Sequence, residues 1–155
     1  MPSPPPRTVT LPPSFRSLTM ARGVRAAMQR EPGKVAIVHG ERRRTYGELV
    51  ARIDRVTRAT AALGLLKGQN AAIVANNGLE YLELVCGVPE AGVAIATVNP
   101  RYTSAEIEAV CNDAEARVVF TDATTAPLVR AARFAAVQRI IEIGPEYEAW
   151  LAAAP

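Results

Sequence analysis

The 155-residue sequence is poor in the residues that build metal, redox and nucleophilic sites. It has one histidine, two cysteines and only 5% aromatic residues. His39, Cys86 and Cys111 lie far apart, without the short spacing of metal ligands. Two cysteines do not make a disulfide framework, and neither has a basic neighbour that would activate a thiolate. We therefore expect a reducing cytoplasmic environment and a solvated turn role for His39.

Long apolar runs are also missing. No stretch approaches the ~20 residues that a membrane helix needs. The first residues, MPSPPPRTVTLPPSF, lack the apolar segment of a secretory signal. Their prolines disfavour regular structure, so we expect residues 1–17 to be a disordered lead-in.

Charge is unevenly distributed along the chain. Residues 1–44 hold nine basic and two acidic residues, whereas residues 45–155 hold nine basic and thirteen acidic residues. A basic arm can bind nucleic acid or an acidic membrane surface. Apart from Arg42-Arg43-Arg44 these cations are scattered, without the interleaved aromatic residues of a nucleic-acid surface. We expect a solvated face and no nucleic-acid partner.

From residue 71 onward, apolar segments alternate with helix-like segments. The apolar segments lie near residues 71–75, 93–98, 117–121 and 139–143, and each is followed by a helix signal. Apolar runs without polar alternation are typical of a parallel sheet covered on both faces. The predicted fold class is α/β, a mostly parallel sheet with helices on both faces. Residues 19–64 should add a helix, a short hairpin and a second helix.

The same periodicity predicts which side chains form the core. The expected core residues are Ile53, Val56, Ile73, Val74, Leu82, Val85, Ile95, Val98, Ile107, Val119 and Ile141.

Three helix starts are marked by a polar residue followed by glutamate three positions later. Thr45 with Glu48 and Thr103 with Glu106 have the spacing of capping boxes. Asn77 is expected to begin another helix. Pro89 should kink or stop that helix, because proline clashes with the carbonyl four residues before it.

Asn99-Pro100-Arg101 joins a buried strand to a helix. Ligands of open α/β sheets lie beyond the carboxyl ends of the strands. The following helix offers unpaired N–H groups, and Arg101 adds a planar cation suited to phosphate. The segment fits either a turn before a capped helix or an anion site.

Several short motifs follow one another along the chain: Thr45-Tyr46-x-Glu48-Leu49, Gly64-Leu65-x-x-Gly68, Asn76 with Glu80, Ala91-Gly92, and Asn99-Pro100-Arg101 followed by Thr103-x-x-Glu106. Their order and spacing resemble the N-terminal portion of the AMP-forming acyl-CoA synthetases, in the adenylate-forming superfamily. The resemblance covers roughly residues 18–125. It departs from the family at Gln69, where an aspartate is usual, and at Pro89.

The resemblance implies an acid–CoA ligase that uses ATP, coenzyme A and Mg²⁺. ATP would activate a fatty, aryl or alicyclic carboxylic acid as acyl-AMP, and the thiol of coenzyme A would then displace AMP. Arg101 is implied as a contact of a coenzyme A phosphate. No catalytic or metal-binding residue is carried over to this chain. The implied partners are the small-molecule acid and the remainder of the synthetase chain, with no integral membrane segment.

The resemblance also implies that the chain is incomplete. The family's phosphate loop, adenine-contacting segment, ribose-binding aspartate and catalytic lysine are expected beyond residue 155. Residues 18–155 would then be a partial N-terminal AMP-binding domain, truncated before the phosphate loop and inactive by itself. The alternatives are a non-catalytic α/β binding module, a peptide-synthetase adenylation domain, or an acyl-carrier-protein ligase.

Overall fold

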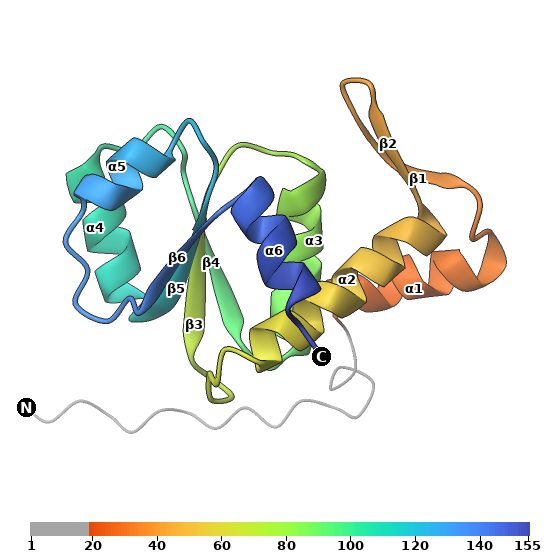
Figure 1. Ribbon diagram of the computed structural model, residues 1–155, viewed down its shortest axis with the longest axis horizontal. Helices are drawn as coiled ribbons and strands as arrows, with labels where there is room; N and C mark the ends of the chain where they lie inside the picture. Colours follow the sequence, from red (N-terminus) through yellow and green to blue (C-terminus); the bar gives the residue numbers. More distant parts are fainter. Residues whose placement is uncertain (1–18) are drawn as a thin grey trace, which may run out of the picture.

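The computed structural model describes residues 19–155, so the predicted lead-in at residues 1–17 lies outside the described part. Six helices and six strands occur in these residues (Figure 1). In chain order they are α1 (Met20–Arg30), β1 (Val35–His39), β2 (Arg42–Thr45), α2 (Tyr46–Ala61), β3 (Asn70–Val74), α3 (Leu79–Glu90), β4 (Ala94–Val98), α4 (Ser104–Asp113), β5 (Ala116–Thr121), α5 (Ala126–Ala131), β6 (Arg139–Glu142) and α6 (Pro145–Ala152).

The four strands predicted from residue 71 onward form one parallel sheet, in the order β4-β3-β5-β6. Strand β3 pairs with β4 from Asn70–Ala94 to Val74–Val98 without a shift in register. Strands β1 and β2 form a separate antiparallel hairpin. The predicted α/β fold class is confirmed.

Helices cover both faces of the sheet (Figure 1). Neighbouring residues of a strand point to opposite faces. Ile73 accordingly packs in the cluster that contains Trp150 of α6, whereas Val74 packs in the cluster that contains Ile107 of α4. Two apolar cores therefore flank one sheet, and this explains why β3 has no polar alternation.

Eight of the predicted core residues are buried: Ile53, Val56, Ile73, Val74, Val98, Ile107, Val119 and Ile141. Leu82, Val85 and Ile95 are only partly buried. Ile95 lies on β4, which is at an edge of the sheet. The buried residues of α3 include Glu83 and Gly87. Because neither is an apolar side chain, a search for apolar periodicity does not place this face of the helix correctly.

Both predicted capping boxes are present. The Thr45 backbone N–H donates to Glu48 Oε2 at 2.7 Å, and the Glu48 N–H donates to Thr45 Oγ1 at 3.2 Å. The expected start at Asn77 is wrong: the residue before α3 is Gly78, and no side chain caps this helix. Helix α3 includes Pro89 and ends one residue later, at Glu90, close to the predicted stop.

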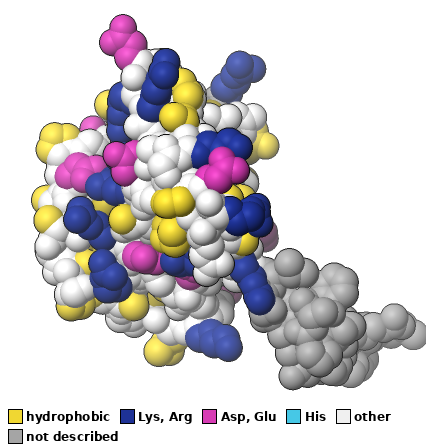
Figure 2. Space-filling model, turned by 90° about the vertical axis from the view of Figure 1, so that its right-hand side faces the viewer, with side chains coloured by type: hydrophobic (Ala, Val, Ile, Leu, Met, Phe, Trp, Pro, Cys, Tyr) yellow, Lys and Arg dark blue, Asp and Glu magenta, His cyan; other side chains and the backbone are white. Residues whose placement is uncertain are grey.

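The basic N-terminal segment is largely paired with acidic side chains. Arg25 bridges Asp54 of α2 at 2.5 Å and Glu90 of α3 at 2.6 Å, so it ties α1 to both helices. Arg42 and Arg44 of the hairpin pair with Glu80 and Glu83 of α3. Figure 2 shows cations and anions interspersed over this side of the molecule. Ion pairs thus fasten α1 and the hairpin to α3.

Helices α2 and α3 approach closely at Gly87. A Cβ atom added to Gly87 would lie 2.6 Å from Val56 Cβ and 2.9 Å from the carbonyl oxygen of Ile53. The Thr57 hydroxyl donates to the Gly87 carbonyl at 3.0 Å across the same contact. The missing side chain therefore allows the two helix backbones to approach.

We predict that Gly87→Ala lowers the free energy of unfolding, by about 1–3 kcal/mol, because overpacking outweighs the better helix propensity of alanine. The matched control is Gly23→Ala in α1, where an added Cβ meets nothing within 4 Å. This control should be neutral or raise stability by up to about 1 kcal/mol. Urea unfolding of both variants is the measurement, and equal effects would contradict the packing role of Gly87.

Candidate functional site

A hollow lies beyond the carboxyl ends of β3 and β4, and we call it the β3–β4 hollow. Its volume is about 420 Å³, within the range of small-molecule sites. It is lined by Ala75, Asn76, Asn77, Tyr81, Thr97, Val98, Asn99, Pro100 and Arg101. Amide, hydroxyl and guanidinium groups thus converge at the sheet edge where α/β proteins bind ligands.

Arg101 lies at this hollow, as its place after a strand predicts. Its backbone N–H donates to Asn99 Oδ1 at 3.0 Å, which closes the turn after β4. The residue is exposed, and within residues 19–155 its guanidinium has no ion-pair or hydrogen-bond partner. A cation held at a concave surface without a partner is available to an anionic ligand.

The start of α4 contributes less positive potential than the sequence indicates. The Thr103 N–H and hydroxyl each donate to Glu106 Oε2 at 2.8 Å, and the Glu106 N–H donates to Thr103 Oγ1 at 3.4 Å. The hydrogen bonds from Thr103, the backbone one first, lower the pKa of Glu106. Because this carboxylate already occupies the helix start, the anion-binding capacity of the corner depends on Arg101.

Asp122, which the sequence analysis missed, ties β3 to the loop after β5. Asp122 Oδ2 accepts the backbone N–H of Asn76 at 2.7 Å and its side-chain Nδ2 at 2.9 Å. Asp122 Oδ1 accepts the Thr124 hydroxyl at 2.6 Å and the backbone N–H groups of Thr124 and Thr125 at 2.9 Å. The carboxylate therefore sets the position of Asn76, which lines the hollow. The Asp-x-Thr-Thr sequence before α5 is the signal that could have indicated it.

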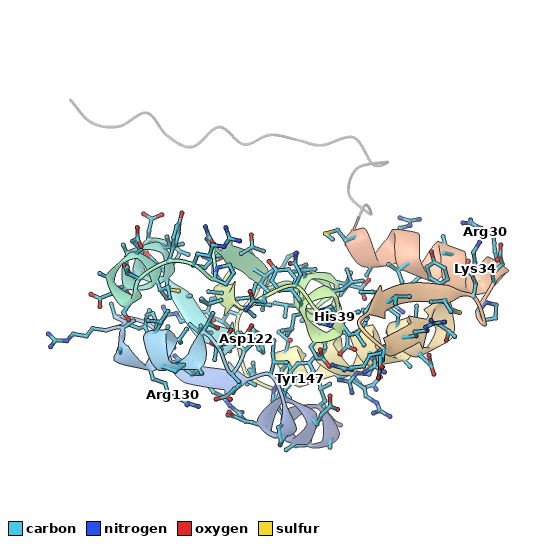
Figure 3. All side chains as sticks on the ribbon, turned by 90° about the horizontal axis from the view of Figure 1, so that it is seen from above. Arg30, Lys34, His39, Asp122, Arg130 and Tyr147 are labelled. Atoms are coloured by element: carbon cyan, nitrogen blue, oxygen red, sulfur yellow. The ribbon has the colours of Figure 1, made fainter. Side chains whose placement is uncertain are left out.

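The hydrogen bonds of Asp122 make its charged form stable. Burial alone would raise the pKa of this carboxyl, but the hydrogen bonds from Thr124, Asn76 and Thr125 outweigh it and hold the pKa well below its ordinary value. Figure 3 places Asp122 centrally, between the helices of the sheet's two faces.

A second charged cluster lies away from the hollow, around Glu83 of α3. Glu83 is fully buried, and Arg52 Nε and the Tyr147 hydroxyl both donate to Glu83 Oε2 at 3.0 Å. Arg44 Nε lies 2.9 Å from Glu83 Oε1, as an ion pair without hydrogen-bond alignment. Arg52 also donates to both carboxylate oxygens of Glu148, at 2.7 and 2.6 Å. This cluster joins four elements and has the character of a structural network.

The remaining reactive side chains form no site. Cys86 and Cys111 are free and buried, and burial raises the pKa of both thiols, that of Cys111 to about 11. His39 is exposed at the end of β1. Across residues 19–155 no three His, Cys, Asp or Glu side chains are grouped to hold a metal ion. The helices of this same part are too short or too polar to cross a membrane.

Comparison with protein families finds that residues 24–153 match the model described as "AMP-binding enzyme". The chain is 28% identical over 124 residues to a fatty acid–[acyl-carrier-protein] ligase, ScoC, of Streptomyces coeruleorubidus, covering 80% of this chain and 24% of that protein. It is 36% identical over 91 residues to a long-chain-fatty-acid–CoA ligase of Thermus thermophilus, covering 59% of this chain and 17% of that protein.

Solved structures show the same fold at low sequence identity. A fatty acyl CoA synthetase of Mycobacterium tuberculosis superposes with a TM-score of 0.80 at 24% identity, covering 88% of this chain and 28% of that one. A benzoate CoA ligase of Burkholderia xenovorans gives a TM-score of 0.78 at 22% identity, with 88% and 29% covered. The chain therefore spans about a quarter of the length of these proteins.

We predict that Asp122→Asn lowers the free energy of unfolding at neutral pH by about 1–3 kcal/mol, because donors that face a carboxylate lose charge-assisted partners. Asp113→Asn, at the exposed end of α4, is the matched control and should change stability little.

The pH dependence separates this role from simple packing. Since folding lowers the pKa of Asp122, its stabilisation is complete above the unfolded pKa of about 4 and is lost as pH falls. The stability gap between wild type and Asp122→Asn should therefore shrink from about pH 5 downward. A gap that stays constant to pH 2 would contradict the charged hydrogen-bond cluster.

Proposed function

The chain belongs to the AMP-binding enzyme family, and we propose that it forms part of an AMP-forming ligase that joins a carboxylic acid to coenzyme A. In this reaction the acid's carboxylate attacks the α-phosphorus of ATP, which yields acyl-AMP and pyrophosphate. The thiol of coenzyme A then forms a thioester at the acyl carbon, and AMP leaves. The proposed acids are fatty, aryl or alicyclic, and the proposed compartment is the cytoplasm, in keeping with two free cysteines.

The observation that carries the coenzyme A assignment is the partner-free guanidinium of Arg101 at the β3–β4 hollow. Coenzyme A has three phosphates on its nucleotide end, and a planar arginine can bind one of them through two parallel hydrogen bonds. Asn99 fixes the turn that holds Arg101 at the rim. Arg101 is therefore proposed as a contact of a coenzyme A phosphate.

Residues 18–155 are proposed to be a partial AMP-binding domain whose partner is the remainder of a synthetase chain. Its length, about a quarter of the similar proteins, supports this proposal. ATP and Mg²⁺ are proposed as cofactors of the complete enzyme. The described residues offer no cluster of metal ligands, and both oxygens of Asp122 already accept hydrogen bonds. No step is assigned to a metal ion held by residues 19–155.

A carrier-protein ligase is the second candidate, favoured by the likeness to ScoC over 80% of the chain. A carrier protein presents the same phosphopantetheine thiol but lacks the 3′-phosphorylated adenosine of coenzyme A. If Arg101 serves coenzyme A, its replacement should weaken use of coenzyme A and leave a carrier-protein acceptor unaffected.

We predict that residues 1–155 alone do not release pyrophosphate from ATP with any carboxylic acid. The described part has no glycine-rich phosphate loop and no lysine at the β3–β4 hollow. A coupled pyrophosphate assay across fatty and aromatic acids is the measurement. Release clearly above the background without enzyme would overturn the proposal of a partial domain.

We predict that Arg101→Ala raises the apparent KM for coenzyme A about ten- to a hundredfold, in an enzyme that joins this chain to the rest of a family domain. The adenylation half-reaction should stay nearly unchanged, and Arg101→Lys should restore only part of the loss, since a point charge lacks the planar fork. Arg133→Ala, an exposed arginine after α5, is the control. A lower melting temperature with unchanged coenzyme A kinetics would leave Arg101 only its turn role.

A further inference from the structure

Three asparagines line the β3–β4 hollow, and neighbouring groups fix the side-chain amides of two of them, Asn76 and Asn99. Asn76 follows β3, and Asn99 follows β4. A free amide can turn over and present either its carbonyl oxygen or its NH₂ group to a ligand. The hydrogen bonds around these two residues remove that freedom and fix what each can offer.

The side chain of Asn76 can offer a ligand only its acceptor oxygen, Oδ1. Its Nδ2 donates to Asp122 Oδ2 at 2.9 Å and to Thr124 Oγ1 at 2.9 Å. The Thr124 hydroxyl donates its only proton to Asp122 Oδ1 at 2.6 Å, so it can only accept a hydrogen bond from Asn76. A carboxylate likewise only accepts. Because both partners are acceptors, Asn76 must direct its NH₂ group toward them, and its remaining side-chain capacity is the acceptor Oδ1.

The side chain of Asn99 offers a ligand hydrogen-bond donors instead. Its Oδ1 accepts the backbone N–H of Arg101 at 3.0 Å. Turning the amide over would set two donors against each other, so the NH₂ group of Asn99 remains available beside the guanidinium of Arg101. The hollow therefore has a donor end at Asn99 and Arg101 and an acceptor end at Asn76.

We propose that the β3–β4 hollow selects a nucleotide whose base carries an amino group, with phosphate at the Arg101 end and the amino group donating to Asn76. The proposal rests on the proposed coenzyme A function and specifies which group of the nucleotide is read. Tyr81 adds an aromatic ring to the lining, and purines stack on such rings. Asp122 is then a positioning residue, since it acts on the base only through the orientation of Asn76.

The test compares two probes on the 155-residue chain by isothermal titration calorimetry. One is adenosine 3′,5′-bisphosphate, and the other is purine riboside 3′,5′-bisphosphate, which lacks only the 6-amino group. We expect the amino compound to bind roughly five- to tenfold more tightly, the effect of one net hydrogen bond. Asn76→Ala should reduce this ratio to below about twofold while phosphate-dependent binding persists.

Further variants separate positioning from stability. Asp122→Asn should also bring the ratio of the two probes' affinities close to one, because an amide at residue 122 no longer forces the orientation of Asn76. The control Asp113→Asn should leave this ratio unchanged. If Asp122→Asn is too unstable to study, Thr124→Val provides the second variant and should lower the ratio.

The outcomes separate the proposal that Asn76 reads the base from the proposal that Arg101 contacts a phosphate. Equal binding of both probes that Arg101→Ala weakens would overturn the base-reading proposal and leave the phosphate contact standing. A ratio that persists in Asn76→Ala would also overturn it. Binding with the expected ratio that Arg101→Ala leaves unchanged would support base reading and overturn the phosphate contact. Absence of binding by either probe would overturn both.

Discussion

The packing of four elements depends on one buried carboxylate, Glu83. It lies on α3 with no exposed surface and faces Arg52 of α2, Arg44 of β2 and Tyr147 of α6. Burial raises its pKa, while Arg52 and Arg44 oppose that rise. Removing one partner from such a cluster typically costs about 3–5 kcal/mol, because the other charge stays buried without compensation. The cluster therefore determines which helices can occupy this face of the sheet.

Arg52 extends this constraint to the end of the chain. Its guanidinium binds both oxygens of Glu148, 96 positions away, and lies over the ring of Tyr147. The two residues of α6 are thus fastened to α2 and α3, and Trp150 is brought against Phe120 of the sheet. Helix α3 is therefore held by contacts with α2, β2 and α6. Tyr81, near its N-terminal end, lines the β3–β4 hollow. The ion network and the candidate site are parts of one arrangement.

A different polar cluster shapes the open edge of the sheet. Asp122 joins the ends of β3 and β5, while Thr125 donates to the Val74 carbonyl at 2.5 Å in the same cluster. These bonds connect neighbouring strands just where their ladder hydrogen bonds stop, so the backbone polar groups remain satisfied. The same bonds set the amide of Asn76. A stabilising contact and the polarity of the β3–β4 hollow therefore have one physical cause.

The sequence by itself determined the features that depend on short spacings. Unbroken apolar strands alternating with helices predicted a parallel sheet, two Thr-x-x-Glu spacings predicted capping boxes, and Pro89 predicted the end of α3. It also placed Arg101 just beyond the carboxyl end of a strand, because that position follows from where the apolar run stops. Only the tertiary structure decided the partners of Glu83, the close approach at Gly87 and the link from Asn76 to Asp122, which join residues 30 or more positions apart. Helix and strand periods constrain neighbours within a turn or two, whereas the partner of a buried charge is decided by which elements pack together.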